Sequence, residues 1–132
     1  MKILATLALI LVLGACTDST GSNSTDHVGV YTMTTVNGDV LPATLSSNGA
    51  DSVEVTAGTV TLNADRTFSE SVSYRITADG AETTEQELVE GLYSRSRNHF
   101  NLNGSDGSLL AADLDGTALT MLRGAFELVY QK

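Results

Sequence analysis

The chain has 132 residues, with seven basic side chains, sixteen acidic ones and a single cysteine. This length allows one small domain, and one cysteine excludes an internal disulfide. The formal net charge of −9 makes nucleic acid an unfavourable partner and predicts repulsion from anionic lipid headgroups as well, because like charges repel.

Residues 1–15 have the organisation of a secretory signal. Lys2 is followed by small and apolar residues over positions 3–13, a run that is too short to span a bilayer. The run ends in Leu13-Gly14-Ala15-Cys16, which resembles the lipobox of bacterial lipoproteins. The resemblance implies cleavage before Cys16, lipidation of its sulfur and attachment to the cell envelope, with Thr17 in the next position implying transfer to the outer membrane. The alternative is an ordinary signal peptide with an incidental cysteine.

Residues 16–27 are predicted to be the lipidated cysteine and a flexible tether. Positions 17–27 hold no apolar residue and are rich in Ser, Thr, Asn, Asp and Gly, so this stretch cannot bury a core. His27, at its end, is expected to be exposed. The remaining residues, 28–132, are expected to form one domain.

The domain is predicted to be all-β. Short runs of Val, Thr, Tyr, Phe and Leu alternate with turn-forming pairs such as Asn37-Gly38, Ala57-Gly58 and Asp79-Gly80, which indicates antiparallel hairpins. Strands are expected near residues 28–36, 39–45, 51–56, 59–63, 67–78, 82–95, 98–103, 108–114, 117–122 and 125–131. The short hairpins favour a small antiparallel up-and-down β-barrel of about eight strands, and a two-sheet sandwich is the alternative. At residues 81–90, Thr84 and Glu87 could instead form a capping box for a short helix.

The clearest strand covers residues 67–77, where apolar and polar side chains alternate. Glu70 interrupts the apolar face formed by Phe68, Val72, Tyr74 and Ile76. A carboxylate on an inward face must be paired, hydrated or protonated, because burial of an isolated charge is costly. Glu70 therefore either reaches water at the barrel rim or anchors a ligand in a small pocket.

Several strand and turn motifs carry a family resemblance. They are Gly29-Val30-Tyr31, Val36-Asn37-Gly38, Leu41-Pro42, residues 57–68 (AGTVTLNADRTF), Gly91-Leu92-Tyr93, Leu119-Thr120-Met121 and the closing Leu128-Val129-Tyr130. In these motifs the chain resembles the small lipocalin-like lipoproteins of bacteria. The resemblance implies an eight-stranded up-and-down barrel that binds a small apolar molecule.

No motif for catalysis, a metal or a cofactor stands out. The serines lie outside Gly-x-Ser-x-Gly and Ser-x-x-Lys patterns, and His27 and His99 do not form a zinc pair. Asp113 and Asp115 share one face of a strand, but they lack the other ligands of a calcium loop. We therefore expect no enzymatic activity, no cofactor and no metal, with solvated carboxylates at these positions.

Two functions follow from the predicted barrel. In the first, a membrane-anchored carrier holds a small apolar ligand, with Tyr31, Phe68, Glu70 and Tyr74 as the candidate ligand-binding residues. In the second, a monomeric envelope module with a filled barrel contacts another protein. Large interior side chains favour a filled barrel. The predicted interior residues are Tyr31, Met33, Val60, Leu62, Phe68, Val72, Tyr74, Ile76, Phe100, Leu102, Leu119, Met121, Phe126, Leu128 and Tyr130.

Overall fold

The computed structural model describes residues 24–132, so the signal segment, Cys16 and Thr17 lie outside the described residues. All regular elements in the described part are β-strands, and none of its segments is a helix able to cross a membrane. The strands are β1 (Gly29–Val36), β2 (Asp39–Val40), β3 (Ala43–Asn48), β4 (Asp51–Leu62), β5 (Thr67–Ala78), β6 (Ala81–Ser96), β7 (His99–Gly104), β8 (Leu109–Asp115), β9 (Ala118–Arg123) and β10 (Phe126–Gln131).

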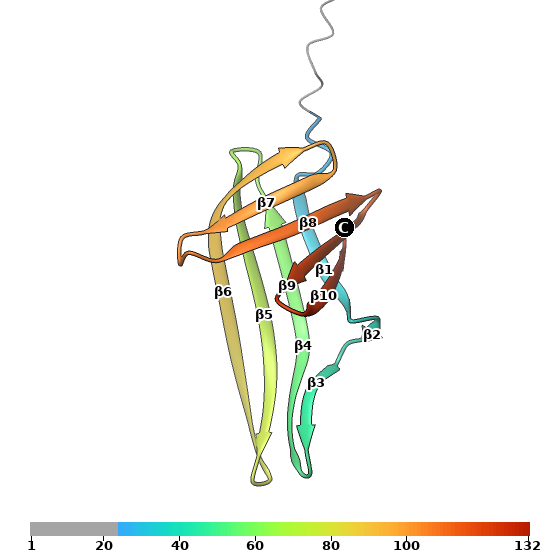
Figure 1. Ribbon diagram of the computed structural model, residues 1–132, viewed down its shortest axis with the longest axis vertical. Helices are drawn as coiled ribbons and strands as arrows, with labels where there is room; N and C mark the ends of the chain where they lie inside the picture. Colours follow the sequence, from blue (N-terminus) through green and yellow to red (C-terminus); the bar gives the residue numbers. More distant parts are fainter. Residues whose placement is uncertain (1–23) are drawn as a thin grey trace, which may run out of the picture.

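The strands close into an antiparallel barrel. From β4 to β10 each strand pairs with its neighbour in sequence, and β1 joins β10 on one side and β4 on the other (Figure 1). The ring therefore contains eight strands, β1 and β4 to β10, while β2 and β3 pair only at its margin. This confirms the predicted up-and-down barrel, and the two-sheet sandwich is wrong.

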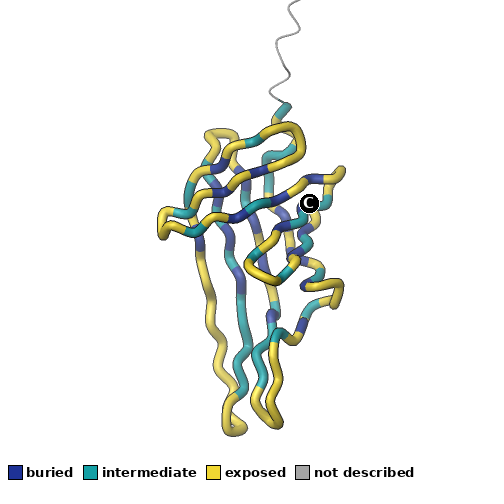
Figure 2. The backbone as a smooth tube through the Cα atoms, in the orientation of Figure 1, coloured by how far each residue is buried: buried dark blue, intermediate teal, exposed yellow. Residues whose placement is uncertain are grey.

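Three ring strands are much longer than the others. β4, β5 and β6 have 12, 12 and 16 residues, whereas β7, β9 and β10 have six each. Their extra length, together with β3, continues past the ring as a four-stranded projecting sheet, made of residues 43–48, 51–55, 74–78 and 81–85 (Figure 1). Buried residues are concentrated in the ring, and the projecting sheet is mostly exposed or half-buried (Figure 2).

Two segments differ from the expected strands. The predicted turn at Ala57-Gly58 is wrong, since β4 runs through it with only a register shift between Val55 and Ala57. Gly58 is needed there for close packing, because a Cβ at this position would lie 2.5 Å from the Cε of Met33. The helix alternative at residues 81–90 is also wrong, because β6 pairs with β5 at each position from Ala81 to Leu92. The strand expected at 39–45 is divided into β2 and β3.

The core fills the ring. All of the predicted interior residues are buried except Tyr74, Ile76 and Phe126, which are half-buried. Tyr31, Phe100 and Tyr130 are 0 % exposed, and such large side chains occupy the interior of an eight-stranded barrel. Further core residues are Val36, Ala43, Val55, Val89, Tyr93, Leu110, Ala112 and Leu114. Residues 24–132 thus contain both the closed ring and its complete core, which makes them a folding unit.

Candidate functional site

Glu70 is the buried charged residue of the described chain. It points inward from β5 and is 1 % exposed. Its Oε1 accepts a hydrogen bond of 2.8 Å from the Tyr130 hydroxyl, and its Oε2 accepts one of 3.3 Å from Nη1 of Arg123. The interpretation that Glu70 reaches water at the rim is therefore wrong, and the carboxylate is paired inside the barrel.

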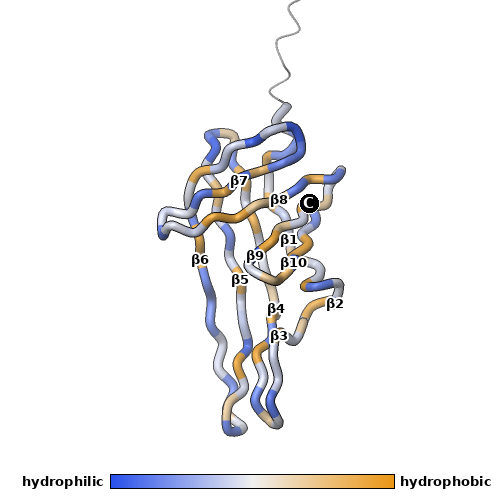
Figure 3. Tube along the Cα trace, in the orientation of Figure 1, coloured by the Kyte–Doolittle hydropathy of each residue, from blue (hydrophilic) through white to orange (hydrophobic). Residues whose placement is uncertain are grey.

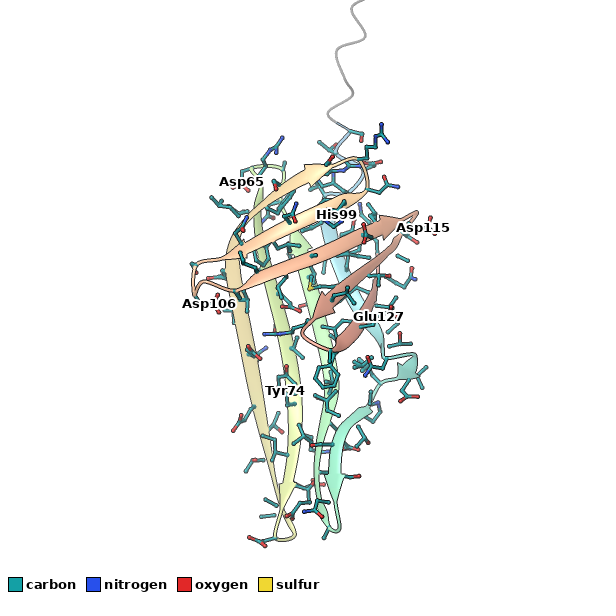
Figure 4. All side chains as sticks on the ribbon, viewed as in Figure 1. Asp65, Tyr74, His99, Asp106, Asp115 and Glu127 are labelled. Atoms are coloured by element: carbon teal, nitrogen blue, oxygen red, sulfur yellow. The ribbon has the colours of Figure 1, made fainter. Side chains whose placement is uncertain are left out.

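The pairing of Glu70 extends to the projecting sheet. Nη2 of Arg123 contacts Oε1 of Glu87, and the other oxygen of Glu87 accepts a hydrogen bond of 3.3 Å from the Tyr74 hydroxyl. We call these five residues, Tyr130, Glu70, Arg123, Glu87 and Tyr74, the carboxylate network. Figure 4 shows Tyr74 on β5 below the shorter strands of the ring, so the network lies where the ring meets the projecting sheet.

Burial sets the proton affinities in this network. It raises the pKa of Glu70, and the Arg123 charge and the Tyr130 hydrogen bond oppose that rise. Burial also raises the pKa of Tyr130, and the neighbouring Glu70 carboxylate raises it further, so the phenol stays protonated and donates its hydrogen bond. Within residues 24–132 each buried side-chain nitrogen and oxygen has a hydrogen-bond partner. The arrangement is thus that of a satisfied structural network.

The four predicted ligand-binding residues do not share one pocket. Glu70 and Tyr74 belong to the carboxylate network, whereas Phe68 is packed in the core. Tyr31 lies near the start of the described chain, where its hydroxyl donates a 2.6 Å hydrogen bond to the carbonyl of His27. None of the four lines the hollow beside His27 or the one lined by residues of β6, β7 and β8. Ligand binding by these residues stays a prediction.

His27 packs against the end of the barrel where the described residues begin. Contrary to the exposed position expected from the sequence, its side chain is only 12 % exposed, and its ring centroid lies 5.5 Å from that of Phe100. Nε2 lies 2.9 Å from the hydroxyl of Tyr93, which donates to the carbonyl of Asn63. Nε2 therefore donates to the Tyr93 oxygen. Nδ1 lies 2.8 Å from Nη1 of Arg95 and 3.0 Å from the carbonyl oxygen of Ser24. The His27 segment is therefore fixed to the barrel.

A hollow of about 510 Å³ opens beside His27, and we call it the arginine groove. Its lining includes Ser24, His27, Arg66, Tyr93, Arg95 and Arg97. Arg66 comes from the β4–β5 turn and Arg97 from the β6–β7 turn. Figure 4 labels Asp65, the neighbour of Arg66, at the end of the ring opposite the tips of the projecting sheet. The sequence analysis does not predict this groove, because Ser24, Arg66 and Arg97 come from three separate segments of the chain.

Asp113, one of the two carboxylates considered for a cation, contacts the side chain of His99 instead. Oδ1 of Asp113 lies 2.9 Å from Nδ1 of His99, and both side chains are substantially exposed. Across residues 24–132 there is no group of three His, Cys, Asp or Glu side chains placed to hold a metal ion. Asp106 has a local role, since it accepts hydrogen bonds from the backbone and hydroxyl of Ser108.

The fold defines the class of protein as a small, closed antiparallel β-barrel with a projecting sheet. Comparison of the chain with protein-family models, with curated proteins and with solved structures gives no match. The arguments for function therefore come from the residues themselves.

Proposed function

We propose that this protein is a lipid-anchored envelope protein that contacts another protein through its projecting sheet. The observation that carries the proposal is the filled ring, whose interior is occupied by buried side chains including Tyr31, Phe100 and Tyr130. A carrier needs a hollow lined by apolar groups, so the filled ring favours the interaction module over the carrier of a small apolar ligand.

The anchor is supported by the sequence. The short apolar run, the lipobox-like Leu13-Gly14-Ala15-Cys16 and Thr17 together suit a lipoprotein of the outer membrane. The resemblance of the domain to lipocalin-like lipoproteins points the same way. Two or three acyl chains give stable attachment, because each buried methylene contributes about 0.8 kcal/mol.

The projecting sheet offers one apolar face. Val53 and Ile76 are paired across β4 and β5, and Tyr74 follows on the same face of β5; all three are half-buried. The opposite face is polar and includes an ion pair of 2.6 Å between Arg75 and Glu54. In Figure 3 the projecting part of β5 alternates between apolar and polar residues in this way. An apolar face without a covering layer is the surface that a partner would bury.

The projecting sheet has a free edge on β6 and another on β3, and the charges of the β6 edge disfavour strand addition there. Residues 81–90 of β6 pair only with β5, and this stretch carries Glu82, Glu85, Glu87 and Glu90. Charged side chains along an edge oppose pairing with another strand. We therefore propose that the partner binds the apolar face and carries basic groups that meet the acidic β6 edge.

The anchor is tested by the mass of the protein extracted from membranes. We expect residues 16–132 plus two or three acyl chains, and Cys16→Ser should release the protein from the membrane or leave it unprocessed. Intact-mass spectrometry with membrane fractionation gives both readouts. A soluble, unmodified mature chain would disprove the anchor.

The contact face is tested with a single introduced thiol. Cys16 is the only cysteine, so once it is acylated, Ile76→Cys places the only reactive thiol on the projecting sheet. In intact envelopes a bound partner should slow maleimide labelling of this thiol at least several-fold relative to the purified protein. The control is Leu109→Cys, at a position that is 79 % exposed on the ring, which should label at similar rates in both samples. Equal labelling of Ile76→Cys in envelopes and in solution would contradict a covered face.

A further inference from the structure

Four of the six basic side chains in residues 24–132 gather at one end of the molecule. Arg66, Arg95 and Arg97 line the arginine groove. Lys132 lies at the same end, where its Nζ donates hydrogen bonds of 2.6 Å to the carbonyls of Asp26 and Val28. A chain with net charge −9 therefore has a locally basic end, a feature that its net charge conceals.

Two of these arginines are available to bind a ligand. Arg95 is held by Asp26, Ser24 and His27. In contrast, Arg66 and Arg97 are exposed, and neither guanidinium forms an ion pair or a hydrogen bond within residues 24–132, where the paired arginines are Arg75, Arg95 and Arg123. A guanidinium presents paired N–H donors that match the oxygens of a phosphate group.

The same two arginines occupy unusual backbone positions. Arg66 has φ of 69° and Arg97 has φ of 56°, in the left-handed region that glycine and asparagine adopt more easily. Turn geometry alone would favour those residues at both positions. A binding role for the side chains gives a physical reason for arginine in both turns.

The carboxylates near the groove are already engaged. Asp26 pairs with Arg95 at 3.3 Å, and Oδ1 of Asp65 accepts hydrogen bonds from the backbone and hydroxyl of Thr67. Asp51 and Asp79 are joined by a hydrogen bond at the opposite end, at the tips of the projecting sheet. β5 spans the two ends with 12 residues, which corresponds to about 40 Å at about 3.3 Å per residue. This exceeds the Debye length of about 8 Å several times, so the distant carboxylates are screened from the groove.

From these observations we infer that the arginine groove binds the phosphate groups of anionic lipids in the membrane that holds the anchor. This inference rests on the proposed anchor, because Ser24 lines the groove and lies eight residues after Cys16. Eight residues span at most about 29 Å, since an extended chain advances no more than about 3.6 Å per residue. The anchor thus keeps the groove close to the headgroups and turns the acidic projecting sheet away from them. The anionic headgroups that the net charge is expected to repel are thus repelled by the projecting sheet and attracted by the arginine groove.

The test uses the chain from Thr17 to Lys132, which contains the complete folding unit and lacks both the apolar run and Cys16. Its binding is measured by co-sedimentation with vesicles of phosphatidylcholine alone and with vesicles that contain one quarter phosphatidylglycerol. We expect stronger binding to the anionic vesicles at low salt and a loss of binding at high salt. The double variant Arg66→Gln with Arg97→Gln should weaken binding about 30-fold, because each basic residue near an anionic surface contributes about fivefold, equivalent to about 1 kcal/mol.

The matched control is Arg75→Gln, which removes a positive charge from the projecting sheet and should leave binding unchanged. Equal binding to the two vesicle types, or an equal loss in Arg75→Gln and Arg97→Gln, would overturn the inference. A titration with inorganic phosphate tests whether the groove binds free phosphate instead of lipid headgroups. If phosphate shifts the His27 ring signals in NMR spectra and the vesicles do not bind, the groove is a site for free phosphate and the headgroup assignment is wrong. The chain from Thr17 to Lys132 lacks Cys16, so the vesicle experiment does not depend on acylation. If the vesicles do not bind, the mass-spectrometric test of the anchor is unaffected. If the full chain is not acylated, the vesicle result is unaffected.

Discussion

Arg123→Met should lower the free energy of unfolding by about 3–5 kcal/mol near neutral pH, because it removes one partner from a buried ion pair. Glu70 is 1 % exposed and would keep only the hydrogen bond from Tyr130. Arg123 also forms an ion pair with Glu87, so the substitution removes this contact between β9 and β6 as well. Urea denaturation followed by circular dichroism measures the change.

Two matched variants distinguish the effect of losing the ion pair from the effect of losing a long side chain. Glu70→Gln combined with Arg123→Met should recover most of the loss, since no charge then remains buried. Arg75→Met removes the arginine of the half-exposed pair with Glu54, and such pairs contribute about 0–1 kcal/mol. A loss below 1 kcal/mol in Arg123→Met, or no recovery in the double variant, would show that the charge pair contributes little.

The same pair predicts a pH dependence of stability. Burial raises the pKa of Glu70 above its ordinary value of 4.5, so between the unfolded and folded pKa values the folded state binds more protons. The unfolding free energy contributed by this group therefore falls as pH rises through that window. Arg123→Met should make this fall larger, because the arginine charge opposes the rise in pKa, and Glu70→Gln should abolish it. Denaturation curves at a series of pH values measure the slope.

Much of the ring could be predicted from alternation within strands. Residues 67–77 show period-two burial through Val72, and the interior set was correct apart from three half-buried aromatic and aliphatic side chains. Two of these residues, Tyr74 and Ile76, are half-buried because they belong to the projecting sheet, beyond the closed ring. Alternation shows which residues share a face, but it does not show where a barrel ends.

The pairing of Glu70 was within reach of the same reasoning. Leu119 and Met121 were predicted to point inward, and Arg123 continues that alternation by one step. Two opposite charges on inward faces imply an ion pair. The arginine groove combines two kinds of contact. Consecutive antiparallel pairing puts the β4–β5 and β6–β7 turns at one end of the barrel, and closure of β1 on β4 brings residues 24–28 beside them. Local sequence patterns carry no signal for that closure.

Phe100→Ala should lower the free energy of unfolding by about 3–5 kcal/mol, the usual cost of removing a fully buried aromatic ring. The Phe100 ring is 0 % exposed and contacts the rings of His27 and Tyr93, with the Arg95 guanidinium 5.5 Å from its centroid. These neighbours also hold residues 24–28 on the barrel and shape the arginine groove. The variant should therefore accelerate backbone hydrogen exchange at Val28, whose amide donates to the carbonyl of Thr25, more than at the distal strands of the projecting sheet.

Leu92→Ala is the control for this effect, because Leu92 is 61 % exposed on the neighbouring strand β6. An exposed substitution of this kind should change the unfolding free energy by less than about 0.5 kcal/mol. Phe100→Leu keeps most of the apolar volume and should give an intermediate loss. If Phe100→Ala cost no more than Leu92→Ala, or if hydrogen exchange rose equally at both ends of the molecule, Phe100 would not be the residue that fixes the His27 segment, and the groove would need another support.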